Sequence, residues 1–253
     1  MTTCAFRVGP RDMPTARAVS GSVGGVEGEQ HAGAGGQEKT FSTFVEGLSN
    51  SGALKAARRF RDLLLRRRCP GALLISGPSG CGKSHLLRAI GSEVESTFGP
   101  TAVRSMTAEQ LLDQAISNLR TGRRPAWPVV RAPCRLFVLD QAEDLARGRE
   151  TQWEVALWAK SRVAAGTAVL IASCRPLSKL AAELSGRREL RTVQMLSPSQ
   201  EEIFEVLRSS ARMVALGPQL RAIATTSRSI PEALGRYQRL VAEVELGLLQ
   251  PVS

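Results

Sequence analysis

Long apolar runs, cysteine pairs and aromatic side chains are all scarce in this sequence of 253 residues. No apolar run approaches the roughly 18 residues that a membrane-spanning helix needs, and no apolar segment of the signal-peptide type opens the chain, so we expect neither a membrane protein nor a secreted one. The five cysteines are scattered, odd in number and without the spacing of metal ligands, which indicates free thiols in a reducing compartment, the cytoplasm. Aromatic residues make up only 4% of the chain and hydrophobic residues 43%, an ordinary globular composition.

Acidic residues are outnumbered, since 34 Lys and Arg face 23 Asp and Glu, which gives a formal net charge of +11. Residues 1–39 hold equal numbers of both signs, so the excess lies in residues 40–253, where arginine dominates. Such an excess suits a partner rich in phosphate, such as DNA. The arginine bias of a GC-rich genome explains it equally well, and charge alone leaves both interpretations open.

The sequence predicts three segments. Residues 1–39 are rich in Gly, Ala and Ser and have too few apolar side chains to offset the entropy of ordering, so we expect a disordered tail, either a recognition arm or an extension without function. Residues 40–196 alternate apolar runs with helical patterns and are typical of an α/β domain with a parallel sheet flanked by helices. Residues 197–253 are helical in pattern and predict a small α-helical lid domain.

Individual elements follow from periodicity and capping. Helices are predicted at about 51–68, 107–120, 154–164 and 177–184, and in the lid at about 198–214, 217–227 and 230–247. Strands are predicted at 72–76, 101–105, 135–140, 167–172 and 192–195. The helix 51–68 carries an arginine-rich face that is either solvated or in contact with phosphate, and Trp127 in the loop 121–133 either stacks on a base or anchors the loop.

One stretch organises the rest, and it is Gly77-Pro78-Ser79-Gly80-Cys81-Gly82-Lys83-Ser84. An apolar run precedes it and a helical pattern follows it, which is the context of a phosphate-binding loop. The three glycines let backbone N–H groups approach an anion, and the helix N-terminus adds the positive end of its dipole. Lys83 would contact the β- and γ-phosphates, and the Ser84 hydroxyl would hold Mg²⁺. The stretch therefore predicts a site for ATP or ADP with Mg²⁺.

A second apolar run, 135–139, ends in Asp140. A buried parallel strand that ends in an acid delivers a carboxylate to the sheet edge, where phosphate-loop enzymes use it to hold Mg²⁺, so Ser84 and Asp140 are the predicted metal residues. Many such ATPases place a second acid directly after the first, as the base for the attacking water, but Gln141 stands here. Either Glu143 substitutes for it or hydrolysis is slow, and Glu143 fits an ordinary helix N-terminal turn equally well.

Several segments together carry a family resemblance. They are Thr40-Phe41-x-x-Phe44-Val45-x-Gly47-x-Ser49-Asn50, Gly82-Lys83-Ser84-His85-Leu86-Leu87-x-Ala89-Ile90-Gly91, Asp140-Gln141-Ala142-Glu143, Arg175-Pro176 with Leu180, and Leu196-Ser197-Pro198-Ser199 through Ala211. Over roughly residues 40–245 they resemble the ATPase module of the bacterial replication initiator DnaA and of its shorter relative Hda, within the AAA+ class. The Asp-Gln-Ala-Glu segment is more similar to the Hda branch than to the initiator.

The resemblance implies a P-loop AAA+ fold and a site that combines several segments. Phe41 would lie beside the adenine, and the stretch from Gly77 to His85 would bind the nucleotide. The implied catalytic residues are Lys83, Asp140, Glu143, Ser173 at a strand tip, and Arg187 or Arg188 as the arginine finger offered to a neighbouring subunit. The implied function is that of a slow ATPase that regulates or assists DnaA-dependent replication initiation, with the initiator, other AAA+ subunits or further copies of itself as partners.

The departures from the family pattern shape this expectation. Cys174 stands where the family usually has Asp, and Pro231 stands where the initiator has its second-sensor arginine, a role that Arg228, Arg236 or Arg239 would have to take. The C-terminal helix-turn-helix of the initiator finds no counterpart here, so we do not predict origin binding by this chain alone. Residues 1–39 contain no convincing sliding-clamp motif, so we do not predict clamp binding. The alternatives are a helicase-loader or insertion-sequence type of DNA-binding ATPase and a nucleotide-bound scaffold without hydrolysis.

Overall fold

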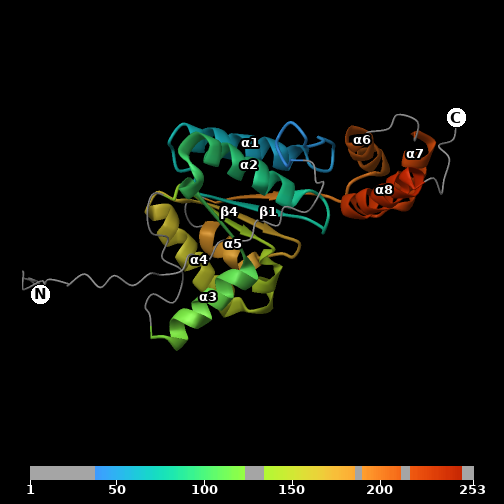
Figure 1. The fold of residues 1–253 in the computed structure, drawn as a ribbon. Helices are drawn as coiled ribbons and strands as arrows, with labels where there is room; N and C mark the ends of the chain where they lie inside the picture. Colours follow the sequence, from blue (N-terminus) through green and yellow to red (C-terminus); the bar gives the residue numbers. More distant parts are fainter. Residues whose placement is uncertain (1–37, 123–133, 186–189, 212–216, 247–253) are drawn as a thin grey trace, which may run out of the picture. The chain divides into compact units, whose positions relative to one another are not determined.

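The computed structural model describes residues 38–122, 134–185, 190–211 and 217–246 (Figure 1). Three predictions therefore lie outside the described residues. They are the tail, apart from its last two positions, residues 123–133 of the predicted loop 121–133, with Trp127, and the arginine-finger candidates Arg187 and Arg188.

Five parallel strands form one sheet in the order β2-β3-β4-β1-β5. Their bounds are β1 Ala72–Ser76, β2 Val103–Thr107, β3 Leu136–Asp140, β4 Ala168–Ser173 and β5 Leu190–Gln194. The central strands are almost entirely buried, as expected of a parallel sheet covered on both faces. Because Ser76 pairs with Ser173 and Thr107 with Asp140, neighbouring strands end level with one another.

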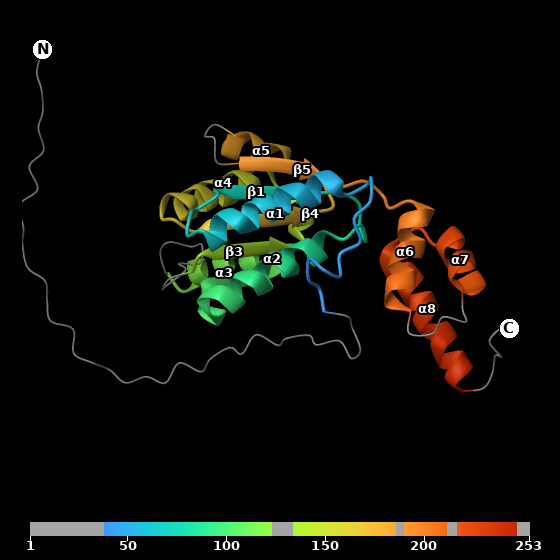
Figure 2. The same cartoon turned by 90° about the horizontal axis from the view of Figure 1, so that it is seen from above.

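Helices cover the two faces of this sheet (Figures 1 and 2). Their bounds are α1 Ser51–Leu65, α2 Lys83–Phe98, α3 Ala108–Arg120, α4 Arg149–Ala164 and α5 Ser178–Ser185. Helices α1 and α2 pack on the face that carries Leu73 and Ile75, and α3, α4 and α5 pack on the face that carries Ala72 and Leu74. The alternation of side chains along β1 thus divides the core into two layers, and the predicted α/β fold with a parallel sheet flanked by helices is confirmed.

Three more helices follow, α6 Gln200–Ser210, α7 Gly217–Thr226 and α8 Ile230–Glu245. They enclose a small core of their own that includes Leu207, Leu220 and Tyr237. Ser199 and Ser229 cap α6 and α8 by accepting the N–H groups of Glu202 and Glu232. Every helix in the described ranges is too short or too polar to span a bilayer.

Some sequence-based bounds need correction. The strand predicted at 101–105 begins only at Val103, because residues 100–102 form a short 3₁₀ helix. The helix predicted at 154–164 begins at Arg149, and Leu157 within it is 41% exposed. Pro198 does not occupy the first turn of a helix, since Ser199 after it is the N-cap of α6.

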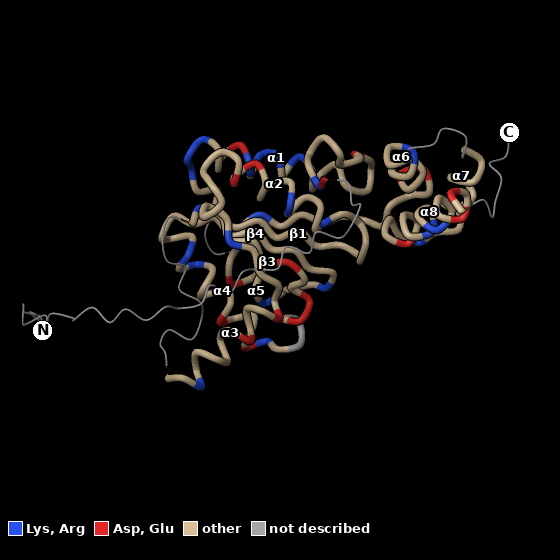
Figure 3. Tube along the Cα trace, viewed as in Figure 1, with Lys and Arg blue, Asp and Glu red and all other residues tan. Residues whose placement is uncertain are grey.

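The first helix also ends earlier than predicted, at Leu65, and the backbone of Arg67 beyond it is left-handed. The Asn50 side chain does not cap this helix; it accepts the N–H of Gly47 and donates to the carbonyl of Val45 instead. The outer face of α1 and its end are basic, as Figure 3 shows. Exposed cations there include Lys55, Arg58, Arg59, Arg66, Arg67 and Arg68.

Candidate functional site

The predicted site residues gather at the carboxyl ends of three adjacent strands. The glycine-rich loop follows Ser76 at the end of β1, Ser173 ends β4, and Asp140 ends β3. Since β4 lies between β1 and β3, the loop and the carboxylate share one edge of the sheet. In open α/β sheets ligands bind outside this edge.

The loop itself adopts a conformation that requires glycine at two positions. Gly80 and Gly82 have φ values of 76° and 103°, in the left-handed region. A Cβ on Gly82 would lie 3.1 Å from Cε2 of Phe44, and one on Gly80 would lie 2.8 Å from Cδ of Pro231. Both the backbone and the close neighbours therefore favour glycine at these two positions.

Lys83 begins α2 and closes the loop with its own side chain. Its Nζ donates to the carbonyl of Gly77 at 2.8 Å and to the carbonyl of Pro78 at 2.7 Å. The side chain is buried, so this charge is held beneath the loop and not in solvent. The third donor of this ammonium group points to Sγ of Cys81 at 3.9 Å, a weak acceptor that an anionic oxygen would displace.

The next residue, Ser84, supplies a hydroxyl that forms no hydrogen bond within the described part of the chain. Asp140 accepts the N–H of Gln141 through Oδ1 at 2.8 Å, which leaves its second carboxylate oxygen for another partner. Hydroxyl and carboxylate oxygens are ligands that Mg²⁺ accepts, so these residue types fit the predicted ion. Gln141 is exposed and left-handed, with φ 53°.

Glu143 and the end of β4 are joined by a contact that the sequence did not reveal. Oε2 of Glu143 accepts the N–H of Cys174 at 3.3 Å. Burial, reinforced by the Glu143 carboxylate, raises the pKa of the Cys174 thiol. The Glu143 carboxylate is thus held at the carboxyl end of β4.

Ser173 is fully buried, and its hydroxyl serves the turn that follows. It donates to the carbonyl of Arg175 at 2.8 Å and accepts the N–H of the same residue at 3.1 Å. The structure therefore shows this side chain engaged with backbone, and the role as a phosphate sensor stays a prediction.

The segment before α1 packs against the start of α2 through His85. Nε2 of His85 lies 2.8 Å from the carbonyl oxygen of Thr40, and the imidazole meets the ring of Phe44 edge-to-face at 5.1 Å. Burial lowers the pKa of His85, and the charge of nearby Lys39 lowers it further, while the hydrogen bond to Thr40 raises it. The net effect is a lowered pKa, so the imidazole is neutral at pH 7.

Phe41 and Phe44 take different places in this segment. Phe41, predicted beside the adenine, packs on the α1–α2 layer with the guanidinium of Arg61 4.8 Å from its ring centroid. Phe44 lies directly against Gly82 in the loop. Sequence reasoning did not assign Phe44 to the site, although the pairing of two aromatic residues just ahead of α1 was a signal for it.

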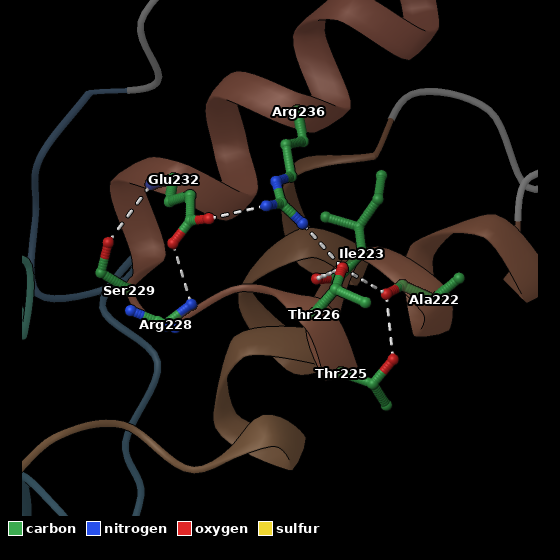
Figure 4. A network of polar contacts seen from close by, with 8 residues as sticks. All are labelled: Ala222, Ile223, Thr225, Thr226, Arg228, Ser229, Glu232 and Arg236. Atoms are coloured by element: carbon green, nitrogen blue, oxygen red, sulfur yellow. Dashed lines mark hydrogen bonds and ion pairs between the residues drawn. The ribbon is translucent and has the colours of Figure 1, made fainter.

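The helical part meets the loop at Gly80, where the nearest atoms belong to Ser229 and Pro231. Of the three arginines considered for the second-sensor role, Arg236 is engaged elsewhere (Figure 4). It donates to Oε1 of Glu232 at 2.8 Å and to Oγ1 of Thr226 at 2.7 Å. These contacts tie α7 to α8, so Arg236 acts within the helical part.

Comparison with known proteins agrees with this geometry. The family described as the bacterial DnaA ATPase domain matches residues 36–197. Among solved structures, domain III of the replication initiation protein DnaA from Thermotoga maritima has 21% identity and a TM-score of 0.67, with 86% of this chain and 93% of that chain covered.

Two further structures have the same fold at lower identity. AMPPCP-bound DnaA from Aquifex aeolicus has 18% identity and a TM-score of 0.66 over 82% of this chain and 66% of that chain. A replication initiator DnaA bound to AMPPCP and single-stranded DNA has 18% identity and a TM-score of 0.63 over 81% of this chain and 65% of that chain. With the family match extending over more than half of its length, this chain belongs to the bacterial DnaA ATPase-domain family.

Proposed function

We propose that the chain binds ATP and Mg²⁺ at the carboxyl edge of its sheet and uses the nucleotide state to regulate or assist DnaA-dependent replication initiation. The observation that carries this proposal is the glycine loop, which Lys83 closes through the carbonyls of Gly77 and Pro78, beside Ser84 and Asp140. A loop of this form at a helix N-terminus offers N–H groups and a cation to phosphates. Mg²⁺, held by Ser84 and Asp140, would neutralise charge on the β- and γ-phosphate oxygens.

Hydrolysis by the isolated chain is proposed to be slow. Gln141 occupies the place of the usual second acid and cannot accept a proton as a carboxylate does. Glu143 is the substitute base in this proposal, and its hydrogen bond from the Cys174 N–H holds it near the tip of β4. Arg187 or Arg188 would be offered to a neighbouring subunit to stabilise developing charge.

The division into a tail of residues 1–39, an α/β domain of residues 40–196 and a lid of residues 197–253 belongs to the same proposal. It is supported by the separate apolar core of α6, α7 and α8. The contact of Ser229 and Pro231 with Gly80 gives the lid a route by which to respond to the occupant of the loop. The partners would be the initiator or other AAA+ subunits, including further copies of this chain.

The test is ATP binding and hydrolysis by the purified chain, alone and mixed with the initiator from the same cell. Lys83→Ala should abolish binding, because it removes the cation that closes the loop. Lys55→Ala, an exposed lysine on α1, is the matched control and should bind ATP normally. Faster hydrolysis in the mixture, lost with Lys83→Ala, supports regulation; robust multiple turnover by the chain alone contradicts slow hydrolysis.

A DNA-binding ATPase of the loader or insertion-sequence type is the second candidate. The observation that favours it is the row of exposed cations on α1, of which Arg58 pairs with Glu46 at 3.5 Å. Binding of ATP without any response to the initiator, together with DNA binding that falls steeply with salt, would favour this function.

A further inference from the structure

Four arginines gather at the edge of the sheet opposite the phosphate loop. Arg66, Arg67 and Arg68 follow the end of α1, and Arg135 directly precedes β3. The N–H of Arg135 donates to the carbonyl of Ala102 at 2.8 Å, which places it at the amino ends of β2 and β3. We name these four residues the amino-edge cluster.

Two members of the amino-edge cluster share one aromatic ring. The guanidinium carbons of Arg67 and Arg135 lie 5.6 Å and 4.4 Å from the ring centroid of Phe98, the last residue of α2. The two cations therefore lie within about 10 Å of each other, although 68 positions separate them in the sequence. Like charges so close repel, and an anion between or beside them would relieve that repulsion.

Acidic side chains do not neutralise the amino-edge cluster. Among the described residues its members form no ion pair, and the nearby acids Asp62 and Glu93 both bind Arg61. Glu95, one turn before Phe98, has a pKa raised by burial alone, so no arginine stabilises its charged form. Within the described ranges, the cluster is thus a concentration of positive charge without an acidic partner.

The backbone of Arg67 adds an independent sign that its side chain matters. The N–H of Arg67 bonds to the carbonyl of Leu64 and the N–H of Arg68 to that of Leu63, which is the helix ending that normally uses glycine at the left-handed position. Arg67 has φ 59° there, at a cost of about 1 kcal/mol relative to glycine. An arginine at a position that favours glycine points to a use for the guanidinium.

Ordinary helix electrostatics explains only part of this arrangement. A cation near a helix C-terminus is favourable, which accounts for Arg66. It does not account for Arg135, which precedes a strand, or for two guanidinium groups on one ring. The site also differs from the nucleotide site, because α2 has 16 residues and so separates Phe98 from Lys83 by about 22 Å.

From these observations we propose that the amino-edge cluster binds the phosphate backbone of duplex DNA. The guanidinium fork matches phosphate oxygens and binds them through charge-assisted hydrogen bonds. Duplex DNA is favoured over a single strand because the Phe98 ring is occupied by two cations and offers no platform for base stacking. The contact is independent of base sequence and of the nucleotide site, so it stands whether or not the proposed function is correct.

The experiment measures binding of the full chain to a labelled duplex of about 30 base pairs by fluorescence anisotropy, from about 50 to 200 mM salt. The test variant is Arg67→Gly/Arg135→Gln; glycine suits the left-handed position, so this change removes a guanidinium without straining the fold. The matched control is Arg208→Gln/Arg221→Gln on α6 and α7, which removes the same charge and also a cation 4.6 Å from a ring, that of Phe204.

The expected result is that the slope of log K against log salt falls in magnitude by about two for the test variant, and that the control keeps the wild-type slope. The proposal is overturned by no measurable duplex binding, by an unchanged slope in the test variant, or by an equal loss in the control. It is also overturned if the test variant loses affinity for single-stranded DNA alone.

Discussion

The junction between the segment before α1 and helix α6 depends on one carboxylate and one glycine. Glu202 accepts the N–H of Ser49 at 3.0 Å through Oε1 and the N–H of its N-cap Ser199 at 2.7 Å through Oε2. Its Oε1 occupies the place where a Cβ on Gly47 would stand. The backbone of Gly47 is not left-handed, so the obstacle to Gly47→Ala is this contact alone.

Gly47→Ala should therefore destabilise the protein by displacing the Glu202 carboxylate. The new methyl group meets the flexible end of a side chain, which can move, so the cost is limited to the hydrogen bonds that are lost. Hydrogen bonds to a charged group contribute about 1.5–3 kcal/mol each when buried, and less when partly exposed, so we expect a loss of about 1–3 kcal/mol. For a chain of this size that lowers the melting temperature by roughly 2–12 °C.

A double-mutant cycle with Glu202→Ala tests this reasoning, with urea unfolding followed by circular dichroism. If displacement of the carboxylate is the whole effect, Gly47→Ala should cost less than about 0.5 kcal/mol in the Glu202→Ala background. Additive costs in the double variant would refute the argument, as would a neutral Gly47→Ala. Gly52→Ala, at a position where a Cβ meets nothing within 4 Å, is the control for glycine replacement itself.

Three further predictions concern the nucleotide site. Gly80→Ala should strain a backbone with φ 76° and loosen the contact of the loop with Ser229 and Pro231. We expect faster proteolysis between the α/β and helical parts of the variant, and an unchanged rate of proteolysis would contradict this prediction. Ser84→Ala should weaken the Mg²⁺ dependence of ATP binding, measured by calorimetry with and without the ion, more than it weakens binding without metal. Burial lowers the pKa of His85, so the unfolded chain binds more protons than the folded one as the pH falls below about 6.5, and the free energy of unfolding should fall with it. His85→Gln should flatten this part of the curve of unfolding free energy against pH. The same curve in the variant and the wild type would count against a neutral imidazole.

These predictions share a physical picture in which the loop at residues 77–84 is enclosed by distant parts of the chain. Phe44 packs on Gly82 from the segment before α1, and Pro231 packs on Gly80 from α8. Glu202 then links that first segment to α6. A change at the loop therefore reaches the helical part by two routes, through direct packing and through the hydrogen bonds of Glu202.

Much of the fold and the core of the site were determined by contiguous sequence. The phosphate loop was predictable because a buried strand, a glycine loop and a helix start lie next to each other in the chain, and each has a local signature. Asp140 was predictable because an apolar run that ends in an acid places that acid at the sheet edge. The helix start at Thr107 followed from short-range capping, which involves residues only a few positions apart.

Tertiary structure alone decided which distant side chains meet. Nothing in the local sequence places Phe44 on Gly82, Glu143 on the N–H of Cys174, or Arg67 and Arg135 on the ring of Phe98. These contacts depend on the order and register of the strands, which bring together residues from separate segments. Local periodicity predicts which face of an element is apolar, but not which partner covers that face. For that reason the sequence predicted the phosphate-binding loop but not the side chains that surround it.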